Sequence, residues 1–212
     1  MESRIGIMNF GLGNVRSLQN ALCTVGADAV VSADKRELSK CDGIVLPGVG
    51  AFEAGRTGLA ETGLDKFAES CFGKKPLLGI CLGLQLLFDE SGETFSGKKS
   101  AAGLGAFAGK VVRFKETGLK VPQVGWNRLD FPKESVLFRG VENGSWAYFV
   151  HSYYAKPALR AEVSAWTAYG KTRFASAVEN AEQKLFATQF HPEKSGSAGL
   201  KILENFVDFC KK

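Results

Sequence analysis

The chain has 212 residues, of which 45% are hydrophobic and 23% are charged. This composition is ordinary for a soluble globular protein, and a chain of this length buries a full core without disulfide or metal staples. The net charge is +5, but the basic residues are scattered or occur in pairs such as Lys74-Lys75, so we expect no nucleic-acid partner. No stretch has the length of a membrane span, and residues 1–9 lack the pattern of a signal peptide, so we expect a cytoplasmic protein that does not bind membranes.

The cysteines indicate a reducing compartment. Their number is odd, no two have C-x-x-C spacing, and the chain has two histidines, so neither a zinc site nor another metal site is predicted. Nothing in the sequence calls for a cofactor. Four of the five cysteines are predicted to pack in the interior as small apolar side chains. These are Cys23, Cys41, Cys71 and Cys210.

The first half of the chain alternates between short apolar runs and segments with helical spacing. The predicted strands are 4–9, 29–31, 43–46 and 77–80, and the predicted helices are 14–25, 64–72 and 82–88. This alternation predicts an α/β fold with a mostly parallel central sheet and helices on both faces.

The second half predicts an antiparallel addition to that sheet. Its strand candidates are 110–114, 124–129, 147–153, 163–169, 173–178 and 185–190, and residues 198–210 have the spacing of a closing amphipathic helix. Residues 91–109 are rich in Gly, Ser and Lys and are predicted to be a loop. We expect a single domain over residues 1–212.

A glycine-rich turn follows the first predicted strand. Gly11-Leu12-Gly13-Asn14-Val15-Arg16 resembles the start of a dinucleotide-binding fingerprint, but Arg16 stands where the third glycine belongs. A tight turn, with Asn14 capping the next helix, is therefore the preferred interpretation.

Cys81 has the setting of a nucleophile. It ends the apolar run 76–80 and has Gly79 and Gly83 two residues away on either side. This pattern is typical of a nucleophile elbow, a sharp strand-to-helix turn, and predicts an exposed sulfur at a helix N-terminus, where the partial positive charge favours the thiolate.

His191 and Glu193 supply the other two groups that thiol-dependent acyl transfer needs. A carboxylate two residues from a histidine can hold one ring nitrogen while the other faces the sulfur. His151 is the only other histidine and is a weaker rival for the role of base.

Pro47-Gly48-Val49-Gly50 follows the predicted strand 43–46. The segment fits a plain turn, and it also fits a backbone donor for an oxyanion, since glycines let an amide N–H turn toward developing negative charge. In the second interpretation, the N–H groups of Val49 and Leu82 are the two donors.

The two motifs Gly79-Ile80-Cys81-Leu82-Gly83-Leu84-Gln85 and Gln189-Phe190-His191-Pro192-Glu193-Lys194-Ser195 resemble those of the class I, triad-type glutamine amidotransferases. Within that family, the chain is similar to the glutaminase subunits of imidazole glycerol phosphate synthase. The likeness runs from Ile5 to Phe209, although Gln123 and Val124 stand where relatives often have His and Met. The subfamily features are Asn9-Phe10-Gly11-Leu12-Gly13-Asn14, Pro47-Gly48-Val49-Gly50, Pro122-Gln123-Val124-Gly125-Trp126-Asn127 and Phe149-Val150-His151-Ser152-Tyr153.

The resemblance implies a role for each matching residue. Cys81 attacks the side-chain amide of glutamine, His191 transfers the proton, and Glu193 orients His191. Ammonia passes to a cyclase subunit with a TIM-barrel fold, in a heterodimer that serves histidine biosynthesis. The residues implied to bind glutamine are Gly48, Gln85, Glu93, His151, Ser152 and Tyr153, and those implied to face the partner are Asn14, Gln123, Trp126 and Lys194.

Three alternatives stay open at this point. The chain is also compatible with a paralogous glutaminase that serves another synthetase, although the segment 47–50 disfavours it. A stand-alone cysteine hydrolase of the same fold is disfavoured by Gln85 and the His-x-Glu spacing. A catalytically silent binding module is disfavoured by the complete Cys81, His191 and Glu193 set.

Overall fold

The computed structural model describes residues 2–115 and 118–211 of the chain. In this part, the α-helices are α1 (Val15–Thr24), α2 (Lys35–Ser39), α3 (Phe52–Thr62), α4 (Leu64–Cys71), α5 (Leu82–Leu86) and α6 (Gly196–Cys210). The strands are β1 (Arg4–Met8), β2 (Asp28–Ser32), β3 (Gly43–Leu46), β4 (Leu77–Ile80), β5 (Phe88–Ser91), β6 (Ala101–Ala102), β7 (Phe107–Arg113), β8 (Gln123–Arg128), β9 (Trp146–His151), β10 (Tyr153–Pro157), β11 (Val163–Tyr169), β12 (Thr172–Asn180) and β13 (Leu185–Thr188).

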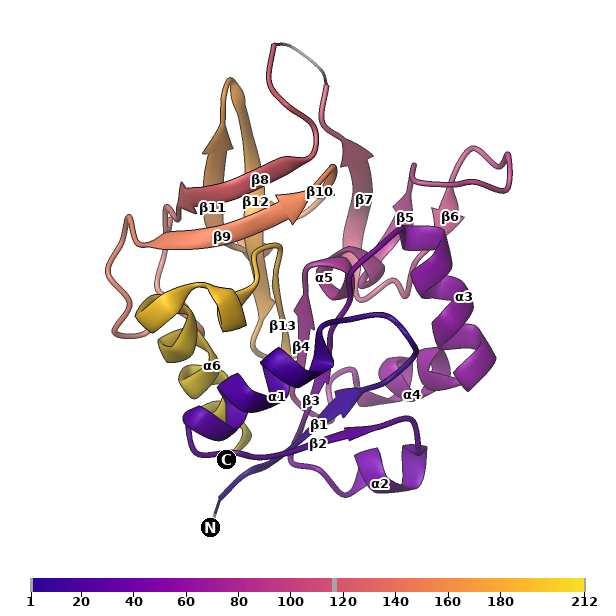
Figure 1. The fold of residues 1–212 in the computed structure, drawn as a ribbon, viewed down its shortest axis with the longest axis vertical. Helices are drawn as coiled ribbons and strands as arrows, with labels where there is room; N and C mark the ends of the chain where they lie inside the picture. Colours follow the sequence, from indigo (N-terminus) through magenta and orange to yellow (C-terminus); the bar gives the residue numbers. More distant parts are fainter. Residues whose placement is uncertain (1, 116–117, 212) are drawn as a thin grey trace.

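The central sheet has seven strands in the order β11-β12-β13-β4-β3-β1-β2. The neighbours from β13 to β2 are parallel, whereas β11 and β12 join the edge in antiparallel orientation. In Figure 1 the helices lie to either side of this sheet. The predicted fold class, a mostly parallel sheet with an antiparallel addition, is confirmed.

Successive side chains of the sheet pack alternately into two separate apolar layers, one on each face. On β3, Val45 packs in the layer that contains Leu22 of α1 and Phe206 of α6. Its neighbour Ile44 packs in the layer that contains Leu59 of α3. Because successive strand residues point to opposite faces, a strand buried on both faces reads as a continuous apolar run, as β3 and β4 do.

The carboxyl ends of three adjacent parallel strands meet at one edge. Gly48 follows β3, Cys81 follows β4 and His191 follows β13, and these strands are neighbours in the order β13-β4-β3. The backbone N–H of Cys81 donates to the carbonyl of Thr188 at 2.8 Å, so the ends of β4 and β13 are tied together. In open α/β sheets this edge is where ligands bind.

Two smaller sheets stand beside this edge. One has the order β10-β7-β5-β6, and the other is the antiparallel ribbon β8–β9. The ribbon crosses in front of β11 and β12 in Figure 1. His191 is fixed to the ribbon because its N–H donates to the carbonyl of Tyr148 at 3.0 Å.

Several sequence-based assignments need correction. Helices α2 and α3 were not predicted, and α3 is weakly signalled because it contains Gly55 and Gly58. A Cβ at Gly58 would lie 2.8 Å from the carbonyl oxygen of Phe10, so close packing requires these glycines. The predicted loop 91–109 contains β6 and the start of β7, and the predicted helix 82–88 ends at Leu86.

Two local expectations have opposite outcomes. The Asn14 side chain accepts from the N–H of Ser17 at the start of α1, so the predicted cap is confirmed. Cys23 is exposed, which contradicts the expectation that it packs inside, while Cys41, Cys71 and Cys210 are buried. All five thiols are free.

Among the described residues, none of the helices combines the length and apolar character that a membrane crossing requires.

Gly83→Ala is expected to destabilise the protein by about 3 kcal/mol. A Cβ at this position would lie 1.9 Å from the backbone oxygen of Leu46, so β3 or α5 must move. Urea unfolding measures the loss. Gly92→Ala is the matched control because its Cβ meets only the carbonyl oxygen of Val111, at 3.9 Å. Equal stability of the two variants would contradict this account.

Candidate active site

Cys81 occupies a strained turn between β4 and α5. Its φ is 55°, in the left-handed region that side chains other than glycine rarely adopt. The turn is tight because α5 folds back on β4, and a Cβ at Gly79 would lie 2.8 Å from the carbonyl oxygen of Gly83. The two flanking glycines therefore permit the crossing, and the predicted nucleophile elbow is present.

The Cys81 side chain lines a cavity of about 310 Å³. The sequence predicted an exposed sulfur, and this prediction is wrong: Cys81 is only 6% exposed, because its sulfur lies inside the cavity and not on an open surface. Of the residues predicted to bind substrate, all except Gly48 line this cavity. The lining residues are Val49, Gly50, Cys81, Leu82, Gln85, Glu93, Pro122, Val150, His151, Ser152 and Tyr153.

His191 and Glu193 form a buried pair. The Nδ1 atom of His191 lies 2.9 Å from Oε1 of Glu193, and both side chains are 3% exposed. Burial by itself lowers the pKa of His191, but the hydrogen bonding and negative charge of Cys81 and Glu193 outweigh it and raise that pKa above the usual value. Nε2 of His191 makes no hydrogen bond of standard geometry among the described residues, so it is free to take a proton on the Cys81 side.

His151 has the opposite electrostatic setting. Burial, together with the nearby His191, lowers the pKa of His151 to about 4, although a hydrogen bond to the carbonyl of Tyr153 at 2.7 Å acts in the opposite direction. The ring packs against Phe114 and Phe174. Among the described residues, no carboxylate pairs with His151 to stabilise a positive charge. His151 therefore lines the cavity in its neutral form, which favours His191 as the base.

The two expected oxyanion donors are not both available. The N–H of Leu82 donates to the carbonyl of Gly48 at 3.3 Å, so the Gly48 oxygen occupies one of the predicted donors. Gly48 is packed against Leu82, since a Cβ at Gly48 would lie 2.8 Å from the Leu82 Cβ. The structure therefore has a closed arrangement in which the Gly48–Val49 peptide presents its oxygen to Leu82.

Two polar side chains sit on the walls of the cavity. Gln85 donates through Nε2 to the carbonyl of Tyr153 at 2.9 Å. Glu93 accepts from the N–H of Phe52 at 2.9 Å, at the start of α3, and burial raises the pKa of its carboxyl. An amide and a carboxyl group facing one cavity suit a ligand that carries both acidic and basic groups, such as an amino acid.

The sequence interpretation missed several neighbours of Cys81. Gly50, Pro122 and Val150 line the cavity, and the Gln189 Nε2 lies 3.7 Å from the Cys81 sulfur. Gln189 stands two residues before His191, and this spacing was the one available signal. The contacts of the other three depend on tertiary packing.

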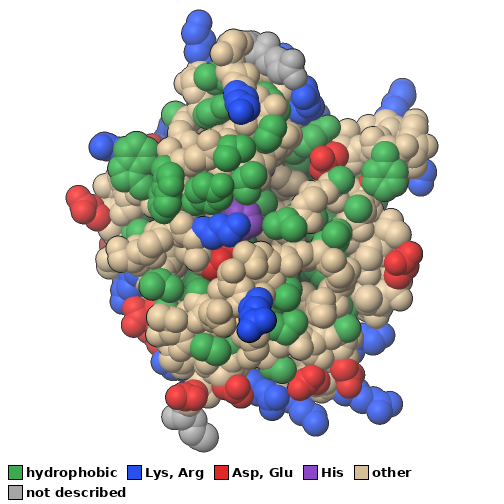
Figure 2. All heavy atoms as spheres, viewed as in Figure 1, with side chains coloured by type: hydrophobic (Ala, Val, Ile, Leu, Met, Phe, Trp, Pro, Cys, Tyr) green, Lys and Arg blue, Asp and Glu red, His purple; other side chains and the backbone are tan. Residues whose placement is uncertain are grey.

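The residues expected to face a partner differ in exposure. Asn14, Trp126 and Lys194 are exposed, whereas Gln123 is buried and donates to the Asn127 side chain at 2.7 Å. On the face shown in Figure 2, hydrophobic side chains gather around a visible histidine. The large apolar residues exposed at the cavity and on the β8–β9 ribbon are Val49, Val124, Trp126, Trp146 and Val150.

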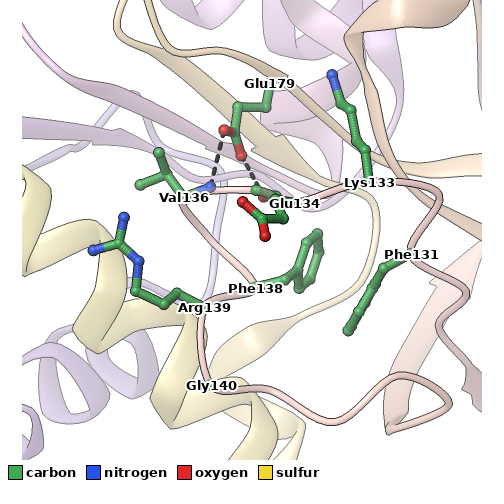
Figure 3. Close-up of a pocket in the computed structure, with 9 residues that line it drawn as sticks. Phe131, Lys133, Glu134, Val136, Phe138, Arg139, Gly140 and Glu179 are labelled. Atoms are coloured by element: carbon green, nitrogen blue, oxygen red, sulfur yellow. Dashed lines mark hydrogen bonds between the residues drawn. The ribbon is translucent and has the colours of Figure 1, made fainter.

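A larger cavity, of about 670 Å³, lies between the segment 131–140 and Glu179 of β12. Figure 3 shows that the Glu179 carboxylate is engaged by that segment, through hydrogen bonds from Ser135 and from the N–H of Val136. The lining contains no cysteine or histidine. The smaller cavity at Cys81 is therefore the candidate active site, because the predicted nucleophile lines it and interacts with the side chain of His191, the predicted base.

Comparisons with known proteins identify the family of the chain. Residues 7–209 match the family described as "Glutamine amidotransferase class-I". Proteins named "Imidazole glycerol phosphate synthase subunit HisH" are 44% identical in Chlorobaculum tepidum, over 96% of this chain and 98% of that one, and 48% identical in Geobacillus kaustophilus, over 96% and 95%. A solved glutamine amidotransferase has a TM-score of 0.74 at 20% identity and covers 98% of this chain and 99% of that one.

His151 is expected to make the protein sensitive to acid. Its folded-state pKa of about 4 lies below the ordinary 6.5, so the unfolded chain binds the proton first as the pH falls. Stability is therefore lost between about pH 6.5 and pH 4, and about 2 kcal/mol of it between pH 7 and pH 5. His151→Asn keeps a donor for Tyr153 but cannot titrate, and urea unfolding at both pH values should show a smaller loss. Equal losses in the two proteins would refute this origin.

Proposed function

The chain belongs to the class-I glutamine amidotransferase family, and we propose that it is the glutaminase subunit of an imidazole glycerol phosphate synthase in histidine biosynthesis. The identity of 44–48% to subunits of that name, over almost the full length of both chains, carries the proposal. The family membership makes it a glutamine-hydrolysing enzyme. We further propose that it works in the cytoplasm, without a nucleic-acid or membrane partner.

In the proposed reaction, the Cys81 sulfur attacks the side-chain amide carbon of glutamine. The thiol proton passes to Nε2 of His191, and then to the leaving nitrogen, so that ammonia departs and a glutamyl thioester remains. His191 then takes a proton from water, whose oxygen attacks the thioester and releases glutamate. The raised pKa of His191 supports this role, because the ring retains the proton that it takes from the Cys81 thiol until the leaving nitrogen receives it.

Glu193 keeps the ring in the productive orientation. Its bond to Nδ1, at 2.9 Å, leaves Nε2 for proton transfer and stabilises the positive charge that forms on the imidazole. Gln85, Glu93 and the backbone of residues 151–153 are proposed to hold the amino-acid part of glutamine, since they line the same cavity as Cys81.

The Gly48–Val49 peptide is proposed to gate the reaction. In a planar trans peptide, the C=O and the following N–H point in opposite directions, so a rotation of this unit replaces the Gly48 oxygen by the Val49 N–H. The Leu82 N–H, now bonded to Gly48, would then be free as the second oxyanion donor. Glycine on both sides of Val49, with Gly50 at a φ of 109°, lowers the cost of rotation.

The partner is proposed to be a cyclase subunit with a TIM-barrel fold that receives the ammonia. Exposed Trp126 and Val124 on the ribbon provide apolar anchors of the kind found at the centre of interfaces. Val49, in the gating peptide, lines the same cavity as Val150, which pairs with Val124 in the ribbon. Lys194 lies over the Tyr148 ring at 5.8 Å and adds a positive charge to the same surface. A docked partner would therefore contact the segment that has to rotate.

Cys81→Ser is expected to abolish glutamine hydrolysis, by several orders of magnitude, because the nucleophile is lost. Release of glutamate from glutamine measures the effect. With the cyclase partner and ammonium salts in place of glutamine, the same variant should support the synthase reaction at the wild-type rate, since the ammonia step does not use the sulfur.

Cys23→Ser is the matched control, since Cys23 is exposed and lies outside the site. It should hydrolyse glutamine like the wild type. Glutaminase activity of Cys81→Ser above about a hundredth of the wild-type level would remove Cys81 from the mechanism. If the wild-type chain hydrolyses glutamine but does not support the synthase reaction with any cyclase subunit, the result would instead favour a paralogue or a stand-alone hydrolase.

The isolated chain is expected to be a poor glutaminase, and a cyclase partner loaded with its own substrate should raise its turnover more than tenfold. Tenfold corresponds to about 1.4 kcal/mol of barrier, which is within the contribution of one oxyanion donor. Steady-state glutamate release with and without the partner measures the change. Full activity of the chain alone, unchanged by the partner, would contradict the gating of the Gly48–Val49 peptide.

A further inference from the structure

Gln189 is a fully buried side chain in contact with the nucleophile, and the mechanism above does not use it. It is 0% exposed, and its Nε2 lies 3.7 Å from the Cys81 sulfur. Its Oε1 accepts from the Nε2 of Gln85 at 3.2 Å. A buried amide that is bonded at both ends is costly to misplace, because an unpaired polar group pays its full desolvation penalty.

The orientation of this amide follows from a backbone carbonyl. The Tyr153 oxygen is only an acceptor, so the group of Gln85 that faces it at 2.9 Å must be the NH₂. The same NH₂ group faces Gln189, which must then present its oxygen to Gln85. The Gln189 NH₂ is consequently directed at the Cys81 sulfur.

An N–H donor suits one protonation state of Cys81 better than the other. A neutral thiol can donate its own proton, and the Val150 carbonyl lies 4.0 Å from the sulfur for that purpose. A thiolate is only an acceptor, and hydrogen bonds to charged groups are stronger than those to neutral ones. The Gln189 amide therefore stabilises the ionised sulfur, and it approaches the sulfur from a different side than His191 does.

We propose that Gln189 is a further catalytic residue, whose side-chain amide holds the Cys81 thiolate and is itself held in register by Gln85 and the Tyr153 carbonyl. This inference rests on the proposed function, in which Cys81 is the nucleophile. It deepens that function, because Gln85 also lines the cavity proposed for glutamine. Substrate that engages Gln85 would act on the nucleophile through Gln189.

The test measures the ionisation of Cys81 directly, without glutamine. Iodoacetamide alkylation is followed against pH in a Cys23→Ser background, since Cys23 is exposed and would react as well. Peptide mapping by mass spectrometry assigns the product to Cys81. The midpoint of this profile belongs to the coupled Cys81–His191 pair and reports the stabilisation of the thiolate.

Gln189→Met keeps the length of the side chain but removes the donor. The alkylation midpoint should rise by about one pH unit, equivalent to about 1.4 kcal/mol. At pH values below the wild-type midpoint, the kcat/KM of the variant for glutamine should be about tenfold lower than that of the wild type. Above the midpoint of the variant, the two values should be equal. Thr188→Val is the matched control: its hydroxyl is also buried, but it donates to the Phe190 carbonyl and not to Cys81. Its midpoint should equal that of the wild type.

Gln85→Met provides a second test that leaves Gln189 in place. Without its partner, the Gln189 amide is free to turn its oxygen toward the sulfur, so the midpoint should rise in the same direction by a smaller amount. This result does not depend on how well Gln189→Met folds, and urea unfolding of each variant confirms that the folded protein is measured.

An unchanged midpoint in folded Gln189→Met, or a loss of activity that is equal at every pH, would overturn the proposal and leave Gln189 as a packing residue. An unchanged midpoint in Gln85→Met would overturn the inferred orientation. Failure of the proposed function looks different: Cys81→Ser would then retain glutaminase activity, whatever the alkylation profiles show.

Discussion

The close crossing of α5 over the end of β4 is the constraint on which the site depends. It places Cys81 at a φ of 55°, a conformation that typically costs on the order of 1–3 kcal/mol outside glycine. The parallel neighbours β3 and β13 hold the turn from both sides, and Gly79 and Gly83 leave room for it. As a result, Cys81, the Gly48–Val49 peptide and His191 meet at one edge of the sheet.

The electrostatics of the site come from two histidines whose environments differ. Both are buried, but His191 has Cys81 and Glu193 as partners and its pKa is raised, whereas His151 is hydrogen-bonded to the Tyr153 carbonyl and its pKa is lowered. Titratable groups pushed in opposite directions mark the acid–base residue. The same burial that keeps His151 neutral makes the folded protein sensitive to acid.

In the proposed mechanism, the resting arrangement links catalysis to assembly with the partner. The Leu82 N–H, an expected oxyanion donor, is hydrogen-bonded to the Gly48 carbonyl at 3.3 Å and is therefore not available to an oxyanion. Val49 is exposed and lines the cavity together with Val150 of the ribbon. A partner bound at this surface could favour the rotated peptide, and such coupling requires contacts that differ between the two states. Glutamine would then be hydrolysed where its ammonia is used.

The sequence by itself determined the parallel core, the elbow at Cys81 and the His191–Glu193 pair, because apolar runs, flanking glycines and a two-residue spacing are local signals. The sequence did not predict helix α3, because Gly55 and Gly58 lower the helix propensity of this segment and are required only by its close packing. The exposure of Cys23, the burial of Gln123 and the strands within 91–109 were likewise decided by tertiary contacts. So was the contact of Gln189 with Cys81, which joins the ends of two strands that are adjacent in the sheet but 108 residues apart in the chain.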